Sequence, residues 1–515
     1  AQAVDNPGNR RRKVRGLLFE QLAIEDKDDL FLEHEILWRG TRRSFQVIFG
    51  NVRELTDETL ETKGGSRKLV IDFPFDDPGR SPAEDLARLS GFRGEDQSAR
   101  TLVWLPAFLS VHAQKDLGTL VKLDDILKSD DTFRRYASHL SGLEQAQARE
   151  LLRNQRSSLR QRLIGYLEGA YGVDTPAAGS VDESCSPDTN FHSLDPSFTP
   201  QPPVGASLEN ALEHLLSQML ESQYPAHPRF GTEIKLNVLR KVQAEVERAA
   251  QVPDGRIAVD KPLRPVMLQI AVPLKLGDMG ETHFALGRDW YSHFSRQVQG
   301  QITVAKLRAA IDEPNSMGLP LHAQNLIILV YADQANRSFF LHGGPYQPKL
   351  EDMPDELELR EQALPSQEDW DEAINRAGKI FGISVSPLRN ASNLSDLGTK
   401  LKDAAGPAVE PCQIVKDRLE GLCRDWLIDT ASCARHQTAG AVLALVQGLA
   451  ADGDAKRRVE FLAHANVETS LDAMGTSYRK TGAVRNAIET TKWELFEAVA
   501  GIVDDRRAAA DGILA

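Results

Sequence analysis

The sequence predicts a multidomain α+β protein with an α/β N-terminal region, a winged-helix-like middle region and an all-α C-terminal bundle. Three observations support this fold class: strand-like runs alternate with helix-like runs near the start, a helix–turn–helix–ribbon order occupies the middle, and helical spacing of apolar residues dominates the last third. The 515 residues exceed what one hydrophobic core holds, since cores stop growing near roughly 250–300 residues. We therefore expect three structural units.

The first region, residues 1–172, is predicted to be an α/β domain. Three short runs rich in β-branched and aromatic residues have the character of buried strands, at residues 45–52, 68–75 and 101–109. Between the second and third runs, Ser81, Pro82 and Glu84 supply an N-cap, a first-turn proline and a capping-box glutamate for a helix. Because strands alternate with helices, we expect parallel pairing. A long amphipathic helix ends the region near residue 171.

Residues 173–206 are predicted to be an acidic, proline-rich linker. The segment contains six prolines, five acidic residues and neither Lys nor Arg. Such a composition buries too little apolar surface to offset the entropy lost on ordering. We therefore expect a flexible segment and a domain boundary here.

The third region, residues 207–365, is predicted to be helical and to contain a winged-helix-like unit at about 301–364. The elements of that unit are helices at 304–311 and 321–334, a turn at 314–318, and strand-like runs at 338–341 and 356–360. This is the order of a winged helix, in which the second helix usually reads DNA. Here the second helix is apolar nearly all round, so we expect it to be buried as a packing element. Residues 366–515 should form an α-helical C-terminal domain.

Composition restricts the function classes. The net charge of −13 argues against a general nucleic-acid binder, because non-specific affinity for phosphates requires a basic surface. The most apolar stretch, residues 439–451, contains Gln447 and is shorter than the ~20 residues of a membrane-spanning helix. Four cysteines in so long a chain do not indicate a disulfide framework. We expect a cytoplasmic protein without a membrane span, and, since it starts without Met and ends in helical sequence, a piece of a longer one.

The sequence offers no ATP-binding loop. A P-loop requires a leading glycine and a Lys followed by Ser/Thr, but Gly378-Lys379 has Ala373 and Ile380 at those positions. Asp72 ends an apolar run in the manner of the Mg²⁺-holding aspartate of P-loop enzymes. An alternative function is therefore a metal-dependent nuclease centred on Asp72. The other carboxylates available for it are Asp76, Asp77, Glu84 and Asp85.

Other metal-type sets match zinc sites poorly. Their residues are Cys412, Cys423, Cys433 and His436 in one set, and Glu281, His283 and His293 in the other. The cysteines are about ten residues apart, whereas paired zinc ligands are usually separated by about two to four residues. This spacing favours cysteines packed in a core. We assign no metal ligand and no catalytic residue.

The candidate nucleic-acid contacts are basic and lie in two places. They are Arg10, Arg11, Arg12, Lys13, Arg15, Arg337 and His342. The first five stand at a predicted helix start, where cations oppose the helix dipole, so an anionic partner and a plain solvated face both remain open. We expect any DNA binding to be weak and strongly salt-dependent.

Four stretches resemble the PglY/BrxC-like family of BREX phage-resistance P-loop ATPases. They are residues 5–15 (DNPGNRRRKVR), 70–76 (VIDFPFD), 277–284 (GDMGETHF) and 336–344 (NRSFFLHGG). The resemblance spans about two thirds of the chain. It implies a portion C-terminal to the family's P-loop domain, which is absent from these residues.

The resemblance also implies the function and the partners. It indicates a non-catalytic interaction and DNA-engagement module of a phage-defence ATPase, acting with a DNA methyltransferase and an alkaline-phosphatase-like protein to block phage replication. ATP and Mg²⁺ are cofactors of the full-length family, and no cofactor is expected for this chain. The sequence leaves a homo-oligomer open.

Overall fold

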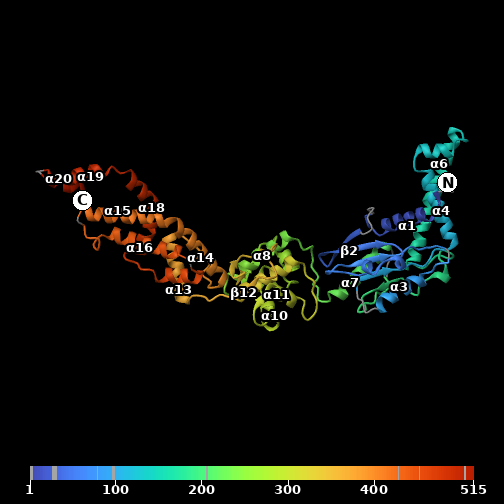
Figure 1. The fold of residues 1–515 in the computed structure, drawn as a ribbon, viewed down its shortest axis with the longest axis horizontal. Helices are drawn as coiled ribbons and strands as arrows, with labels where there is room; N and C mark the ends of the chain where they lie inside the picture. Colours follow the sequence, from blue (N-terminus) through green and yellow to red (C-terminus); the bar gives the residue numbers. More distant parts are fainter. Residues whose placement is uncertain are drawn as a thin grey trace. The chain divides into compact units, whose positions relative to one another are not determined.

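The chain divides into two compact units, which are described separately (Figure 1). In this computed structural model, unit 1 consists of Ala1–Ile234 with Asp312–Pro320, and unit 2 of Lys235–Ile311 with Leu321–Ala515. The structure describes residues 4–25, 32–77, 79–94, 99–203, 207–426, 428–451, 453–503 and 506–514. The chain length correctly predicted more than one unit, but the structure has two units and not the expected three.

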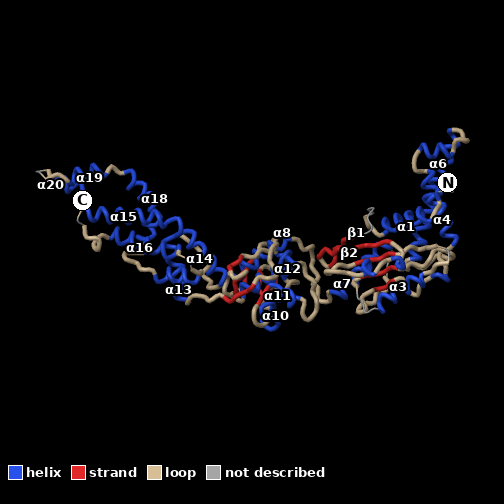
Figure 2. The backbone as a smooth tube through the Cα atoms, in the orientation of Figure 1, coloured by secondary structure: helices blue, strands red, loops and turns tan. Residues whose placement is uncertain are grey.

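A five-stranded mixed sheet forms the centre of unit 1. Its strands, in spatial order, are β1 (Leu32–Trp38), β2 (Thr41–Phe49), β3 (Lys68–Ile71), β4 (Thr101–Trp104) and β5 (Phe191–Ser193). The predicted parallel pairing is confirmed for β2 with β3 and for β3 with β4, whereas β1 and β5 pair antiparallel at the two edges. Figure 2 shows these strands in red between α1 (Pro7–Gln21) and α3 (Pro82–Gly94).

Alternate residues of the parallel strands enter different cores. In β3, Leu69 and Ile71 join a large core while Val70 faces a smaller one, as the two-residue period of a strand requires. Helices α1, α4 (Val111–Ile126), α6 (Gly142–Ala170) and α7 (Leu208–Gln223) contribute to the large core, and α3 contributes to the smaller one. The parallel strands are therefore covered on both faces, which explains their continuous apolar character.

The long amphipathic helix at the end of the first region is confirmed as α6. Ser141 is its N-cap and forms a capping box with Glu144, whose carboxylate accepts a hydrogen bond from the Ser141 backbone N–H at 2.8 Å. Leu159, Leu163 and Leu167 are buried at helical spacing. The apolar face of this helix therefore lies as its helical spacing predicted, whereas the capping box was not predicted.

Residues 173–203 differ from the expected flexible linker. They contain β5, which pairs with β4, and Phe191 and Leu194 are buried in the cores of unit 1. The Asn190 side-chain amide donates to the carbonyl oxygens of Leu105 at 2.8 Å and Ala170 at 3.0 Å. Two apolar side chains and backbone pairing to an existing strand thus order a segment whose average composition predicts disorder. Residues 204–206 lie outside the described part of the chain.

Helix α7 belongs to unit 1, although the predicted boundary at residue 206 assigns it to the middle region. Leu212, Leu216 and Met219 of α7 are buried in the large core. Unit 1 continues to Ile234 and also includes Asp312–Pro320. The amino-acid composition changes after residue 206, which is why a boundary was predicted there. The apolar face of α7 nevertheless packs on the preceding sheet.

The first part of unit 2 contains small antiparallel sheets and helices. One sheet has the order β6 (Arg256–Ala258), β8 (His283–Leu286), β7 (Gly277–Met279), and the other has the order β11 (Gly344–Tyr346), β10 (Arg337–Leu341), β12 (Glu358–Glu361), β9 (Ile302–Thr303). The helices are α8 (Leu236–Ala250), α9 (Arg264–Val266), α10 (Asp289–Gln297), α11 (Val304–Ile311) and α12 (Leu321–Gln334). The predicted helices at 304–311 and 321–334 are both confirmed.

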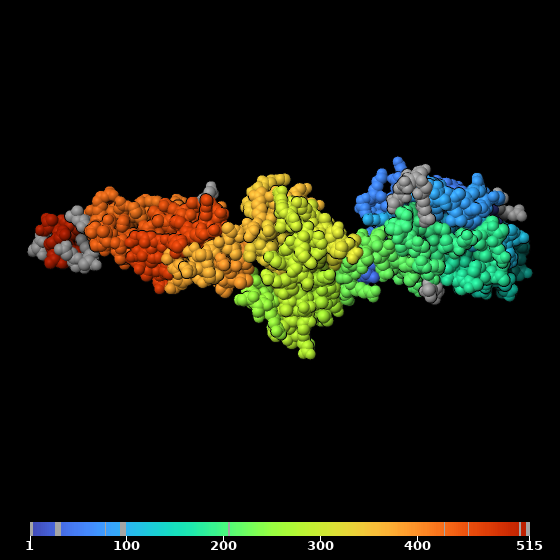
Figure 3. Space-filling view, turned by 90° about the horizontal axis from the view of Figure 1, so that it is seen from below, coloured from blue at the N-terminus to red at the C-terminus, as the bar shows by residue number. Residues whose placement is uncertain are grey.

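The C-terminal part of unit 2 is helix-rich, as predicted. Its helices are α13 (Gln367–Arg376), α14 (Ala391–Ala405), α15 (Val409–Asp425), α16 (Ala434–Ala450), α17 (Ala455–His464), α18 (Leu471–Thr490), α19 (Trp493–Ala500) and α20 (Arg507–Leu514). The core contains Trp370, Leu397, Val446 and Leu462. Helices α19 and α20, dark red in Figure 3, leave Leu495 and Phe496 exposed. Among the described residues, no helix is long and apolar enough to cross a membrane.

We predict that Gly398→Ala destabilises this helical region and Gly421→Ala does not. A Cβ at Gly398 of α14 would lie 2.6 Å from Cβ and 2.9 Å from Cα of Ala455 in α17, so the helices must separate, at a cost of about 1–3 kcal/mol. A Cβ at Gly421 of α15 meets nothing within 4 Å, so alanine should stabilise the helix by up to about 1 kcal/mol. Denaturant unfolding checks both variants, and equal effects would contradict the packing argument.

Candidate functional site at the carboxyl ends of the parallel strands

The residues after β2, β3 and β4 form the first candidate site, because ligands of α/β folds bind at the carboxyl ends of parallel strands. Asp72 directly follows β3 and is 4% exposed. Its carboxylate accepts hydrogen bonds from the backbone N–H groups of Val52 at 3.1 Å and Phe73 at 2.6 Å. Its own backbone N–H donates to the Trp104 carbonyl oxygen at 3.1 Å. Asp72 thus joins the ends of three strands.

The environment of Asp72 favours the protonated carboxyl. Burial raises its pKa well above the usual range, and the nearby Asp85 carboxylate raises it further. Burial also raises the pKa of Asp85, even though Arg53 contacts it. The Tyr171 hydroxyl donates to the Asp72 carbonyl oxygen at 2.5 Å, and burial raises the pKa of this phenol well above its usual value. Asp72, Asp85 and Tyr171 are therefore buried polar groups whose hydrogen bonds stabilise the fold.

Arg53 lies at the centre of the other carboxylates. It follows β2 in the turn Val52–Glu54, and its guanidinium binds Asp85 at 2.9 and 3.2 Å, Glu84 at 3.0 Å and Asp76 at 2.7 Å. Arg11 of α1 binds the other Asp76 oxygen at 3.1 Å. The side chain of Arg53 is 14% exposed and those of Asp76 and Asp85 are 6% and 2% exposed. Bidentate contacts of this kind are strong and geometrically specific.

This geometry does not support the nuclease hypothesis. Guanidinium groups occupy the space between the carboxylates that a metal ion would need, and Asp77 is exposed. Among the described residues, no group of three or more His, Cys, Asp or Glu side chains is arranged to hold a metal ion. The acidic cluster around Asp72 is therefore neutralised by arginines within unit 1.

The basic residues of α1 are mostly engaged within unit 1. Arg10 binds Asp5 at 2.6 Å, Arg11 binds Asp76, and Lys13 binds Asp124. The Arg15 guanidinium lies 5.1 Å from the centre of the Phe19 ring. Arg12 is exposed and donates to the Asn9 side chain at 3.2 Å. These ion pairs offset the cost of cations at a helix start.

The remaining two basic candidates lie in unit 2. Arg337 begins β10, is half-buried and donates from Nη1 to the Leu359 carbonyl oxygen at 3.3 Å. His342 is exposed in the turn between β10 and β11, where His342 and Gly343 have positive φ angles of 49° and 86°. Two successive positive φ angles are typical of a two-residue hairpin turn. The turn therefore holds the His342 side chain at the surface.

The two sets considered for zinc do not form sites. The Cys412 thiol contacts the Thr481 hydroxyl at 3.7 Å, and Cys412 and Cys423 are buried in the helical region. His293 Nε2 binds the Ala310 carbonyl oxygen at 2.7 Å, whereas His283 Nδ1 pairs with the Thr282 hydroxyl at 2.8 Å. The Cys412 thiol and the two histidine nitrogens thus have local partners, whereas Nε2 of His436 is buried without a hydrogen-bond partner among the described residues. Gly378 and Lys379 lie in the π-helical turn Ala377–Phe381, not in a phosphate-binding loop.

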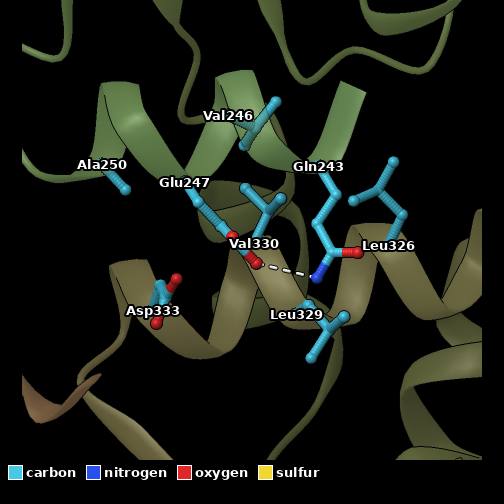
Figure 4. A pocket seen from close by; sticks show the side chains of 8 residues that line it. All are labelled: Gln243, Val246, Glu247, Ala250, Leu326, Leu329, Val330 and Asp333. Carbon is cyan, nitrogen blue, oxygen red and sulfur yellow. Dashed lines mark hydrogen bonds between the residues drawn. The ribbon is translucent and has the colours of Figure 1, made fainter. Parts of the chain in front are cut away.

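A small hollow in unit 2 lies between α8 and α12 (Figure 4). Its volume is about 10 Å³, and the Gln243 amide donates to the Glu247 carboxylate at its edge at 2.7 Å. Burial, with a smaller contribution from the Glu247 carboxylate, raises the pKa of Asp333, on the other helix, to about 6. The hollow has room for about one water molecule, so it is a packing defect with a perturbed carboxyl and not a ligand pocket.

Arg53 was not identified from the sequence. It stands alone in the polar turn after β2, and its partners are about 20–30 positions away in sequence, so no local spacing connects them. The only available signal was that an arginine directly follows one predicted strand and acidic residues follow the next. The ends of neighbouring parallel strands lie close together, so these side chains could have been expected to meet.

Family comparisons give three successive matches. The model of the PglY fourth domain matches residues 1–224, that of the BREX System ATPase PglY protein 5th domain matches residues 237–332, and that of the 6th domain matches residues 374–515. No solved structure matches the chain. The chain is therefore similar to three consecutive domains over most of its length.

Proposed function

We propose that this chain, which belongs to the PglY family of BREX system ATPases, is a non-catalytic interaction and DNA-engagement module of such a phage-defence ATPase. The claim that the module is non-catalytic rests on one observation. The carboxylates of Asp76, Glu84 and Asp85, which lie near Asp72, are paired with Arg53 or Arg11. Carboxylates neutralised in this way are poorly placed to bind Mg²⁺ or to activate water. Catalysis by the whole protein would then depend on other domains.

The DNA-engagement part is supported by the order of elements in unit 2. Helix α10, strand β9, helices α11 and α12, and the β10–β12 hairpin follow one another as in a winged helix, and β12 pairs with both β10 and β9. The β10–β11 turn carries the exposed His342 at the position of a wing. A winged helix is thus our proposal for residues 289–361.

Helix α12, the counterpart of a recognition helix, is buried. It packs against α8, α10, α11 and β10, and residues 325–328 and 330–332 of α12 are all buried. Asn325 is 3% exposed and binds the Arg308 guanidinium at 2.7 Å and the Leu350 carbonyl oxygen at 2.8 Å. These contacts favour a packing role for α12, so we propose that DNA contacts come from the wing and from Arg12.

We predict weak, strongly salt-dependent binding to duplex DNA. If about two to four phosphates are contacted, the affinity should fall roughly ten- to hundredfold between about 50 and about 200 mM salt, because bound counterions are released. Fluorescence anisotropy measures this. The Arg12→Ala variant should bind more weakly at both salt concentrations, since Arg12 is the exposed basic residue among the five of α1.

His322→Ala is the matched control, because His322 is the half-buried second residue of α12, which packs within unit 2, and should not contact DNA. Tight, salt-insensitive and sequence-specific binding that His322→Ala abolishes would refute the proposed packing role of α12. Asn325→Ala is a poor probe on its own, since the loss of its contacts to Arg308 and Leu350 would destabilise the domain.

We also propose that the module contacts other BREX proteins, among them a methyltransferase and a phosphatase-like protein. Large apolar side chains exposed on and after α19 support a protein partner at this part of unit 2: Leu495 is 63% exposed and Val503 is 91% exposed. Co-purification with each partner should be lost in Leu495→Asp. Retained binding of both partners would place the contact elsewhere.

A further inference from the structure

Arg67 of unit 1 is buried and has no carboxylate partner among the described residues. It directly precedes β3 and is 8% exposed. Its Nε donates to the Gln223 Oε1 atom at 2.8 Å, and its Nη2 donates to the Tyr224 hydroxyl. Both acceptors are neutral and lie at the C-terminal end of α7. Buried guanidinium groups are ordinarily paired with carboxylates or phosphates, so this environment is unusual.

Arg43 of β2 lies beside the same tyrosine and also has only neutral acceptors. Its Nε donates to the Thr41 hydroxyl at 3.0 Å and its Nη2 to the Gly318 carbonyl oxygen at 2.6 Å. The guanidinium carbons of Arg43 and Arg67 lie 5.0 and 5.2 Å from the centre of the Tyr224 ring. Burial lowers the pKa of Arg43 to about 10, and the positive charge of Arg67 contributes to this shift. Two cations therefore share one partly buried environment.

Gln223 adds a donor without an acceptor. Its Nε2 atom is buried and has no hydrogen-bond partner among the described residues. The orientation of the amide is fixed, because the Arg67 Nε–H requires the oxygen on its side. A buried N–H group without an acceptor destabilises the folded state. The cluster thus contains more hydrogen-bond donors and more positive charge than this part of the chain can satisfy.

The fold offsets only part of this charge. The C-terminal end of α7 supplies roughly half a negative charge, and the Tyr224 ring face attracts both guanidinium groups. Arg100, exposed just before β4, adds a further cation that lowers the pKa of Arg67, after the larger effect of burial. The net charge of the cluster therefore stays positive in a protein whose overall charge is −13.

We propose that Arg43, Arg67 and Gln223 bind a small oxyanion of the phosphate class. Guanidinium and amide N–H groups match the geometry and charge of phosphate oxygens. The burial of Arg67 restricts the ligand to a compact group, so a free phosphate or the phosphate of a mononucleotide fits this cluster and a DNA duplex does not. The proposal is independent of the DNA engagement proposed above, which involves other residues.

The test is the thermal unfolding of the whole chain in inorganic phosphate, compared with sodium chloride at equal ionic strength. Binding to the folded state alone should raise the Tm of unit 1 by several degrees as phosphate becomes saturating, in proportion to the logarithm of its concentration. The rise should be lost in Arg43→Gln and Arg67→Gln. Adenosine monophosphate as a second probe separates the two sources: an Arg43-dependent rise at lower concentration than phosphate identifies a nucleotide.

Arg42→Gln is the matched control. Arg42 precedes Arg43 in β2, but its side chain is 61% exposed and pairs with Glu233 and Glu35, so the phosphate response should remain. Equal responses of wild type, Arg42→Gln and Arg43→Gln would reveal a general salt effect and overturn the proposal. If the glutamine variants do not fold, calorimetric titration of the wild-type chain with phosphate decides, and the absence of binding at millimolar concentrations overturns it.

Discussion

Arg53→Met should lower the free energy of unfolding of unit 1 by roughly 3–5 kcal/mol at neutral pH, because it leaves buried carboxylates without their counter-charge. Arg53 is the common partner of Asp76, Glu84 and Asp85, two of which have nearly inaccessible side chains. Methionine preserves much of the apolar volume of the arginine stem, so the effect reports mainly on charge. Denaturant unfolding followed by tryptophan fluorescence measures the change, since Trp104 lies in the same unit.

The matched control for this variant is Arg80→Met. Arg80 binds the same Glu84 oxygen at 2.7 Å, but its side chain is 54% exposed, so its loss should cost less than about 1 kcal/mol. Adding Asp85→Asn to Arg53→Met should recover part of the lost stability, because one unpaired buried charge is removed. Similar effects of the Arg53 and Arg80 variants, without recovery in the double variant, would show that the carboxylates are already neutral or solvated.

Unit 1 should lose stability as the pH falls from about 6.5 toward 4, owing to His227. Burial lowers the pKa of His227 from 6.5 to about 4, and Arg43 and Arg39 add to the shift. Between these two values the unfolded chain binds a proton that the folded chain excludes, so acid favours unfolding. The stability is fully present above pH 6.5 and its loss amounts to roughly 3 kcal/mol near pH 4.

Burial favours the neutral form of this histidine, although its hydrogen bond to the Met317 carbonyl oxygen raises the pKa and opposes the shift. His227 is 4% exposed, its ring stacks on Trp38 with 4.7 Å between centres, and Nδ1 donates to the Met317 carbonyl oxygen at 2.6 Å. His227→Gln keeps a neutral polar group and should unfold with a weaker pH dependence. Comparing the two proteins at each pH cancels other titrations, including that of Asp333. An unchanged pH slope in the variant would rule out His227 as the cause.

Local signals in the sequence predicted the helices best. The apolar spacing of the helix that ends near residue 171 and the apolar run of residues 321–334 act through neighbours within a few positions, so both helices appear as expected. Strand β1 was missed, because its Glu33, His34 and Glu35 interrupt the apolar pattern of a strand at the sheet edge. Charged side chains on edge strands hinder pairing with other chains.

The sites depend on contacts that sequence spacing does not encode. Arg53 meets Glu84 and Asp85, and Arg67 meets Gln223, only after the sheet has formed. Residues 191–194 are ordered by a strand that lies about 90 positions earlier in the chain. The average composition of residues 173–206 does not reveal the importance of Phe191 and Leu194, whose burial orders the segment. Non-local pairing therefore accounts for most of what the sequence did not predict.

The inclusion of residues Asp312–Pro320 in unit 1 has a consequence for the timing of synthesis. The Ala226 backbone N–H donates to the Ser316 carbonyl oxygen at 3.1 Å, Met317 binds His227, and Gly318 binds Arg43. A ribosome that adds about 5–20 residues per second delivers residues 235–311 first, a delay of roughly 4–15 s during which the nascent unit lacks these partners. The surface around Arg43 and Tyr224, which Gly318 later contacts, is then exposed and available to chaperones. A gene fragment ending at residue 224 would keep that surface uncovered permanently.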